Sequence, residues 1–338
     1  MFDNERGIFD FIDPAKNDKF SFMKGNDLYE LFVLLDNYYL EYREKLGFRD
    51  YVTFGMELEF EDAKMDLIKR KLAELYLNGE WNLTSEISVM DNDGAEVISP
   101  ICSDNKITWN DLNMVCNMLK ENAYIGENSG GHIHIGTQVI GDNPRAWLNF
   151  IKLWSVYENI IFRFGYGEFL SARSNIDIFA DSIGKSLWKV YKRFSKSKFV
   201  TTSDIIKDMN CNRCTAVELS KVSNFDYFEP FNTIEFRFPN GSLEPVIWQN
   251  NINLIVNILE YVKKSSFDDD IINKRYFLNK GKVCSLEDYD YIYLKQALEL
   301  CDMVFDTNLD KIYFLRQYLK SFQVSKGEFV RAKTFVRK

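Results

Sequence analysis

The chain has 338 residues, of which 46% are hydrophobic, and a formal net charge of −8. This composition supplies a large core, and the acidic balance excludes a protein whose whole surface binds nucleic acid. No stretch reaches the roughly 20 apolar residues that span a bilayer, and the first residues lack the plan of a signal peptide. The six cysteines are scattered, as in a reduced protein. We therefore expect a cytoplasmic protein that binds neither membrane nor nucleic acid.

The first 50 residues predict an arm followed by a helix, which we take as an N-terminal unit. Residues 1–25 show no clear period. From Asp27 to about Leu46, apolar residues recur at helical spacing, and Gly47 offers a stop.

The segment from Tyr51 to Glu61 predicts a β-strand. Its alternation places Glu57 and Glu59 on one face, about 6–7 Å apart along the strand. Taken alone, this pair favours the solvated face of an edge strand. A helical pattern follows over residues 63–77.

Residues 81–100 predict a hairpin. Glu86 and Ser88 would share one face of its first strand, Glu96 would lie in the second, and Asp91–Gly94 would form the turn. A helical pattern covers residues 108–122.

The segment Ser129–Gly136 holds the only two histidines of the chain, His132 and His134, one residue apart. In a strand both imidazoles point to the same face, while the isoleucines between and after them point to the other. A His-x-His pair is also found as a purely structural feature, so its meaning depends on partners elsewhere in the chain.

Two phosphate-binding motifs are excluded. Gly165-x-Gly167 lacks the third glycine of a dinucleotide fingerprint, and Gly184-Lys185-Ser186 lacks the first glycine of a P-loop because residue 179 is Phe. The basic segment 185–198 favours a solvated helix face, with a guide for phosphate or an acidic peptide as the alternative.

Two later segments, Thr215–Leu219 and Thr233–Pro239, are strand-like, and the second places Glu235 and Arg237 on one face. Cys211-x-x-Cys214 lacks the second Cys or His pair of a zinc site. Helical patterns cover residues 144–164, 246–263, 285–305 and 309–323, and a basic tail covers residues 326–338. We divide the rest of the chain into a catalytic domain, 51–265, and a helical C-terminal extension, 266–338, packed on it.

Four separate strands thus present ionisable groups at same-face spacing. One sheet with a polar face would gather them, and gathered carboxylates need either raised pKa values or neutralising cations. Because no further histidine is available, a carboxylate-rich shell suits Mg²⁺ or Mn²⁺ better than zinc. Such ions commonly bridge a triphosphate, whose remaining charge Arg237 and Arg213 would hold.

These motifs, in this order, resemble those of the carboxylate–amine ligase superfamily that includes glutamine synthetase and glutamate–cysteine ligase, and most closely its amidoligase branch. The resemblance covers roughly residues 50–260. The matching segments are Gly55–Phe60, Gly94–Pro100, Gly131–His134 and Thr233–Arg237.

The resemblance implies an α+β fold: a curved antiparallel sheet, or half-barrel, with flanking helices and helical terminal extensions. It implies an enzyme that uses ATP to phosphorylate a carboxylate, which an amine then attacks to give an amide. By matched position, the metal ligands would be Glu57, Glu59, Glu86, Glu96, Glu235 and His132. His132, His134, Arg213 and Arg237 would bind the nucleotide, and Glu57, Glu235 and Arg237 would be catalytic. Glu218 stands where this family tends to carry Asn.

The substrates expected from the resemblance are a carboxylate and an amine, with a peptide or a cell-wall fragment among the candidates. The aromatic-rich helices also allow a homo-oligomer. Two alternatives stay open: metal-dependent phosphoryl transfer or hydrolysis at the same site, and a non-catalytic ATP-binding structural protein.

Overall fold

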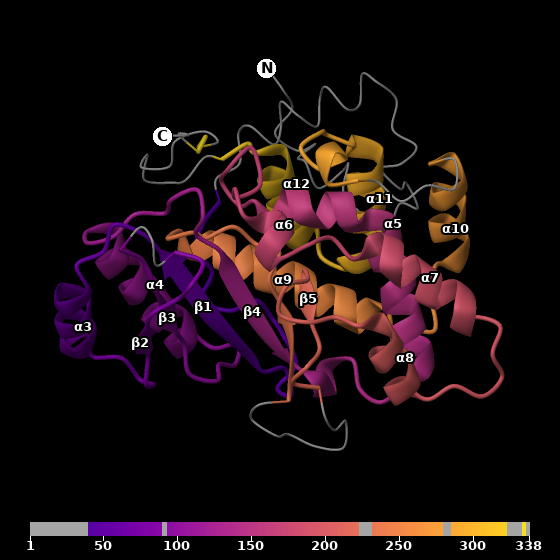
Figure 1. Cartoon of the computed structure of the whole chain (residues 1–338), viewed down its shortest axis with the longest axis horizontal. Helices are drawn as coiled ribbons and strands as arrows, with labels where there is room; N and C mark the ends of the chain where they lie inside the picture. The colour runs from indigo at the N-terminus through magenta and orange to yellow at the C-terminus, as the bar shows by residue number, and fades with distance from the viewer. Residues whose placement is uncertain (1–39, 90–92, 223–231, 280–284, 323–332, 336–338) are drawn as a thin grey trace.

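The protein is an α+β molecule built on one six-stranded antiparallel sheet (Figure 1). The computed structural model describes residues 40–89, 93–222, 232–279, 285–322 and 333–335. The sheet order is β2–β3–β1–β4–β6–β5. The strands are β1 (Phe54–Phe60), β2 (Asn82–Thr84), β3 (Ala95–Ile98), β4 (Gly131–Gly136), β5 (Val217–Glu218) and β6 (Thr233–Phe236).

Alternation along the central strands β1, β4 and β6 gives the sheet one apolar and one largely polar face. Met56, Leu58 and Ile133 are fully buried on the apolar face. Their neighbours in sequence, Glu57 and His132, face the other way and lie directly opposite each other in the β1–β4 register. The sequence prediction of a shared polar face is therefore confirmed, because directly paired residues point to the same side.

Helices pack on the apolar face and extend beyond both sheet edges. The ring of Phe54 stacks on Trp109 with centroids 5.1 Å apart, and Phe236 lies 5.9 Å from Trp154. In Figure 1, α3 and α4 lie beside β2 and β3, whereas α7, α8 and α10 lie beyond β5. The helices are α3 (Met65–Glu74), α4 (Lys106–Lys120), α5 (Pro144–Gly165), α6 (Ile176–Phe179), α7 (Gly184–Phe194), α8 (Thr202–Met209), α9 (Pro245–Tyr261), α10 (Asp269–Leu278), α11 (Leu294–Val304) and α12 (Asn308–Leu319), with 3₁₀ turns η4 (Thr137–Val139) and η5 (Leu286–Asp288).

The C-terminal helices complete the core. Helix α12 packs against α5, α9 and α11. Both α5 and α9 are buried over most of their length. None of the helices in the described ranges is long and apolar enough to span a membrane.

The sheet is open and is neither closed nor strongly curled, which differs from the expected half-barrel. Its outermost strands, β2 and β5, have only three and two residues. Closing or curling a sheet requires long, tilted strands with staggered pairing, and strands this short do not supply them. The α+β class and the antiparallel pairing are confirmed.

The predicted helix from Asp27 to Leu46 is wrong over residues 40–46, which have no helical structure; its earlier part lies outside the described residues. Side chains from distant elements bind this backbone instead. Gln249 accepts from the Arg43 N–H at 2.9 Å and donates to the Arg43 carbonyl at 2.6 Å. Tertiary contacts have overridden the local periodicity.

Two further predictions need correction. Glu86 and Ser88 do not share a strand, because β2 ends at Thr84 and a turn follows. The single helix over 285–305 is instead the short turn η5 and the separate helix α11. Residues 91 and 92 of the predicted hairpin turn, the arm 1–25 and most of the basic tail lie outside the described residues.

Candidate active site

The strand register gathers the ionisable residues of four strands into one cluster on the polar face of the sheet. Glu59 lies opposite Glu96 on β3, and His134 lies opposite Glu235 on β6. Glu57 lies opposite His132. Cβ atoms of directly opposed residues are about 5 Å apart, so these side chains must interact.

Glu57 lies between the two histidines and contacts both. His132 Nδ1 is 2.7 Å from Glu57 Oε2, and His134 Nε2 is 2.8 Å from Glu57 Oε1. Burial by itself would raise the pKa of Glu57, but the hydrogen bonds from the two imidazoles outweigh burial and hold this pKa well below its usual range. Glu57 is therefore an anion at the centre of the cluster.

Glu59 is buried beneath the start of β4. Its Oε2 accepts the Gly130 N–H at 2.5 Å, and its Oε1 lies 3.1 Å from His132 Nε2. The guanidinium of Arg173, which is buried, occupies the space next to Gly130 and donates to the carbonyls of Pro239 and Arg237, both at 3.1 Å. Arg173 thus places a buried positive charge beside Glu59.

Glu235 is held by two cations. Its Oε1 accepts from Arg237 Nη1, and its Oε2 lies 2.9 Å from Lys221 Nζ. Burial would raise the pKa of Glu235, but its electrostatic interactions with His134, His132 and Arg237 lower it to about 2. The buried carboxylate of Glu218, opposite Glu235 on β5, lies 3.9 Å from the same Arg237 nitrogen.

Glu96 behaves in the opposite way from Glu57. Burial raises its pKa to about 9, and the negative charges of Glu57, Glu86 and Glu59 add to the effect. At neutral pH this carboxyl is therefore protonated while no additional cation is present.

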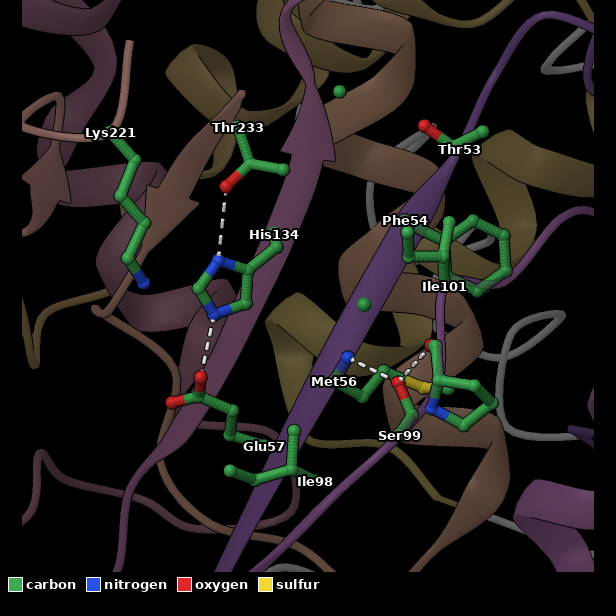
Figure 2. A pocket seen from close by; sticks show the side chains of 13 residues that line it. Thr53, Phe54, Met56, Glu57, Ile98, Ser99, Ile101, His134, Lys221 and Thr233 are labelled. Carbon is green, nitrogen blue, oxygen red and sulfur yellow. Dashed lines mark hydrogen bonds and ion pairs between the residues drawn. The ribbon is translucent and has the colours of Figure 1, made fainter. Parts of the chain in front are cut away.

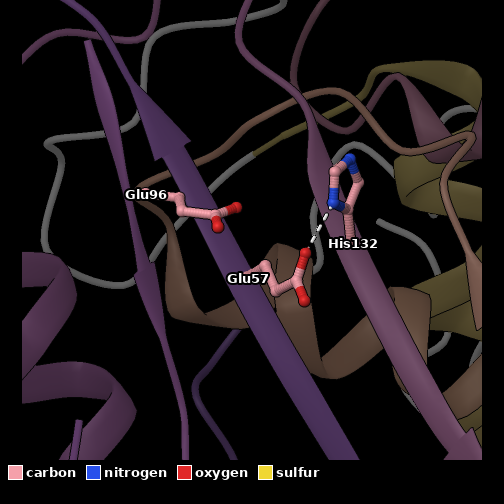
Figure 3. Close-up of side chains that lie close together, drawn as sticks. All are labelled: Glu57, Glu96 and His132. Carbon is pink, nitrogen blue, oxygen red and sulfur yellow. Dashed lines mark hydrogen bonds and ion pairs between the residues drawn. The ribbon is translucent and has the colours of Figure 1, made fainter. Parts of the chain in front are cut away.

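Two groups of side chains have the spacing of metal-ion ligands, and they share Glu57. They are Glu57, Glu96 and His132, drawn in Figure 3, and Glu57, His134 and Glu235; in each, one ligand atom per residue lies within 4.8 Å of the others. In the first group, Glu96 Oε2 is buried without a hydrogen-bond partner among the described residues, whereas both ring nitrogens of His132 contact carboxylates. Buried polar atoms normally have partners, so this carboxyl oxygen fits a site that binds a cation. A set of carboxylates with a single imidazole suits Mg²⁺ or Mn²⁺.

A cavity of about 360 Å³ opens beside this cluster, on the side where β1 begins. Its walls include Ile98, Pro100 and Ile101, and its polar lining includes Glu57, His134 and Lys221. Figure 2 shows the Lys221 side chain extending toward His134 and Glu57. The site therefore combines a charged floor with a partly apolar chamber large enough for a small molecule.

Comparison with known protein families identifies the family of this chain. The sequence model of a family described as "Putative amidoligase enzyme" matches residues 78–259, which is more than half of the chain. The chain belongs to this amidoligase family. A comparison with curated proteins gave no match.

The amidoligase match begins after β1, so it does not include Glu57 or Glu59. The structure adds these residues to the site, because β1 pairs with β3 on one side and β4 on the other, and both lie inside the matched range. Membership of the family indicates that the protein is a ligase enzyme.

Most of the residues selected from the sequence lie together. Glu57, Glu59, Glu96, His132, His134, Glu235 and Arg237 all belong to the contacts described above. Glu86 affects Glu96 through its charge but is in neither ligand group, and Arg213 is exposed on the turn before β5. Their proposed metal-binding and nucleotide-binding roles stay predictions.

Sequence reasoning missed Arg173 and Lys221. Arg173 lies in a loop between α5 and α6 with no recognisable motif, and Lys221 lies in the turn just after β5. The only sequence signal for either is a basic residue near a strand that carries an acid, and such signals are too common to be selective.

We predict that Gly130→Ala destabilises the protein. A Cβ at this position would lie 1.5 Å from Arg173 Nη1 and 3.0 Å from Glu59 Oε2, so the buried guanidinium would have to move. We expect the free energy of unfolding to fall by about 1–3 kcal/mol, as for other overpacked sites. Denaturant unfolding measures the change. Gly55→Ala is the control, because its added Cβ would meet its nearest neighbour at an ordinary 3.6 Å. Equal stability of the two variants would contradict the packing argument.

We also predict that Mn²⁺ binding releases a proton from Glu96. The metal binds the carboxylate, and the free carboxyl has a pKa of about 9. The affinity for Mn²⁺ should therefore increase by up to about tenfold for each unit by which the pH is raised, until the pH reaches that value. Calorimetry in buffers of different ionisation enthalpy measures the proton count. Glu96→Gln should remove this pH dependence, and a wild-type affinity that does not vary with pH would contradict the prediction.

Proposed function

We propose that the protein is an ATP-dependent carboxylate–amine ligase that forms an amide through an acyl phosphate. The observation that carries this proposal is the pair of ligand groups that share Glu57 beside a cavity of about 360 Å³. One such group can bind a single cation. Two groups joined by one carboxylate suit a reaction in which phosphate charge is spread over neighbouring oxygens.

When bound, ATP and Mg²⁺ would supply the phosphoryl group and the positive charge that makes its transfer favourable. The γ-phosphoryl group would pass to an oxygen of the substrate carboxylate, and ADP would leave. The amine nitrogen would then form a bond to the acyl carbon, and inorganic phosphate would leave with the former carboxylate oxygen. A proton lost from the amine completes the balance.

The residues of the chain have distinct roles in this proposal. Glu57, Glu96 and His132 would bind one cation, and Glu57, His134 and Glu235 a second. Arg237 forms an ion pair with Glu235, a member of the second ligand group. From this position its guanidinium would stabilise negative charge on the transferred phosphoryl group. The partly apolar cavity would take the uncharged part of a bound reactant, with its phosphate or carboxylate toward the cations.

The carboxylate and amine are expected to be small molecules, a peptide or a cell-wall fragment. Family membership and the acidic cluster support amide formation over the alternative of simple phosphoryl transfer or hydrolysis. The direct contacts of Glu57 with His132 and His134 support an active site over a structural ATP-binding protein.

The first test measures ATP binding by calorimetry with and without Mg²⁺. We expect binding only with Mg²⁺, and loss of binding in Glu57→Gln. Glu44→Gln is the matched control, because Glu44 is an exposed acid that pairs with Lys106 at 2.6 Å and belongs to neither ligand group. A folded wild-type protein that binds no ATP with Mg²⁺ would contradict the proposal.

The second test traps the activated carboxylate. The enzyme is incubated with ATP, Mg²⁺, hydroxylamine and the small-molecule fraction of a cell extract, and hydroxamates are identified by mass spectrometry. We expect ADP and a hydroxamate. The rate of hydroxamate formation should fall at least about 100-fold in Glu57→Gln and Glu235→Gln, because each substitution removes a charged ligand of the cation that stabilises the transferring phosphoryl group. Phosphate release that needs no amine and gives no hydroxamate would favour a hydrolase.

A further inference from the structure

Lys221 and Arg237 share the carboxylate of Glu235, but they differ in their freedom to move. Glu235 is 2% exposed. The side chain of Lys221 is 45% exposed and that of Arg237 is 12% exposed. One buried anion is therefore held from one side by a buried cation and from the other by a cation that reaches in from solvent.

The oxygen of Glu235 that Lys221 contacts is the one that faces His134, another member of the second ligand group. Glu235 forms a ligand group with Glu57 and His134, and the nearer of its oxygens to His134 Nδ1 is Oε2, at 3.9 Å. Lys221 Nζ lies 2.9 Å from this same Oε2. A divalent cation and an ammonium on one oxygen would repel each other strongly in a partly buried site. A metal ion that binds Glu235 through Oε2 therefore competes with Lys221 for this oxygen.

Lys221 is the cation that can leave. Arg237 is fixed by a second hydrogen bond, from its Nε to the carbonyl of Phe179 at 3.2 Å, and it lies beside Glu218. For Lys221, the described residues provide one side-chain hydrogen bond, to Glu235. Its flexible four-carbon stem can turn away at little cost, whereas a fixed guanidinium cannot.

The place to which Lys221 can move is the cavity that it already lines. Glu57, His134 and Thr233 line the same space, as Figure 2 shows. An ammonium released from Glu235 would there lie near any phosphate bound by the metal ion. Phosphate oxygens are good partners for a lysine ammonium.

We propose that Lys221 is an exchangeable cation of this site. It neutralises Glu235 while the Glu57–His134–Glu235 group has no metal ion. When a divalent cation takes Glu235, Lys221 moves to a phosphate oxygen of the bound nucleotide. The nucleotide half of this inference rests on the proposed function, whereas the competition with metal does not.

The metal half is tested with Mn²⁺ alone, without nucleotide. Lys221→Met removes the competing charge, so Mn²⁺ should bind roughly tenfold more tightly, within the usual range of coupling between sites. Lys221→Arg keeps the charge and should bind Mn²⁺ like the wild type. Lys264→Met is the matched control: Lys264 is 36% exposed and pairs with Asp306 at 2.7 Å. Unchanged or weaker Mn²⁺ binding by a folded Lys221→Met variant would overturn the inference.

The nucleotide half is tested with ATP at saturating Mg²⁺. Lys221→Met should bind ATP roughly tenfold more weakly, which is opposite in sign to its effect on Mn²⁺. A merely structural lysine would move both affinities in the same direction. Equal ATP affinity of wild type and Lys221→Met would overturn this half. If wild-type protein binds no ATP at all, the proposed function and the nucleotide half fail together, while the Mn²⁺ comparison still decides the competition.

Discussion

The contact of one carboxylate with two histidines holds the candidate site together. Glu57 on β1 reaches His132 and His134 on β4 with its two oxygens, at 2.7 and 2.8 Å. Because both histidines come from one strand, the β1–β4 register fixes all three groups at once. The remaining acidic side chains lie around these three residues, and each must be neutralised by a cation, a proton or a hydrogen bond.

The neighbouring acids are neutralised in three different ways. Glu235 has Arg237 and Lys221, Glu59 has the Gly130 N–H and the nearby Arg173, and Glu96 takes a proton because its pKa is raised to about 9. The cluster can therefore fold without a divalent cation, yet it leaves one buried ligand oxygen, Oε2 of Glu96, without a hydrogen-bond partner among the described residues. Such a site is stable without a divalent cation and still has a ligand atom that can bind one. We regard this balance as the physical basis of the proposed ligase chemistry.

The apolar face of the sheet gives these groups a rigid support. Met56, Leu58 and Ile133 alternate with the site residues and are completely buried, so a shift of one residue in any strand would expose core side chains. Burial on one face thus enforces the geometry on the other. The cavity lies where this rigid floor meets the residues after β3, including Pro100 and Ile101.

Period-two alternation explains why so much of the site could be predicted. Glu57 with Glu59, and His132 with His134, share a face in any strand, and strands with one buried face have little choice of register. Contacts that depend on loops could not be found this way. Arg173 reaches the site from a loop between helices. At residues 40–46, where the sequence predicts a helix, the backbone is irregular and Gln249 forms hydrogen bonds with it at Arg43. The curl of the sheet depends on the lengths of its edge strands β2 and β5, which local patterns define poorly.

The central claim, that Glu57 is shared by two cations, is tested most directly by anomalous diffraction from crystals grown with Mn²⁺ and a non-hydrolysable ATP analogue. The account predicts two Mn²⁺ ions, one contacting Glu57, Glu96 and His132 and the other contacting Glu57, His134 and Glu235. Ions bound elsewhere, with Glu57 still paired only to the two histidines, would contradict it.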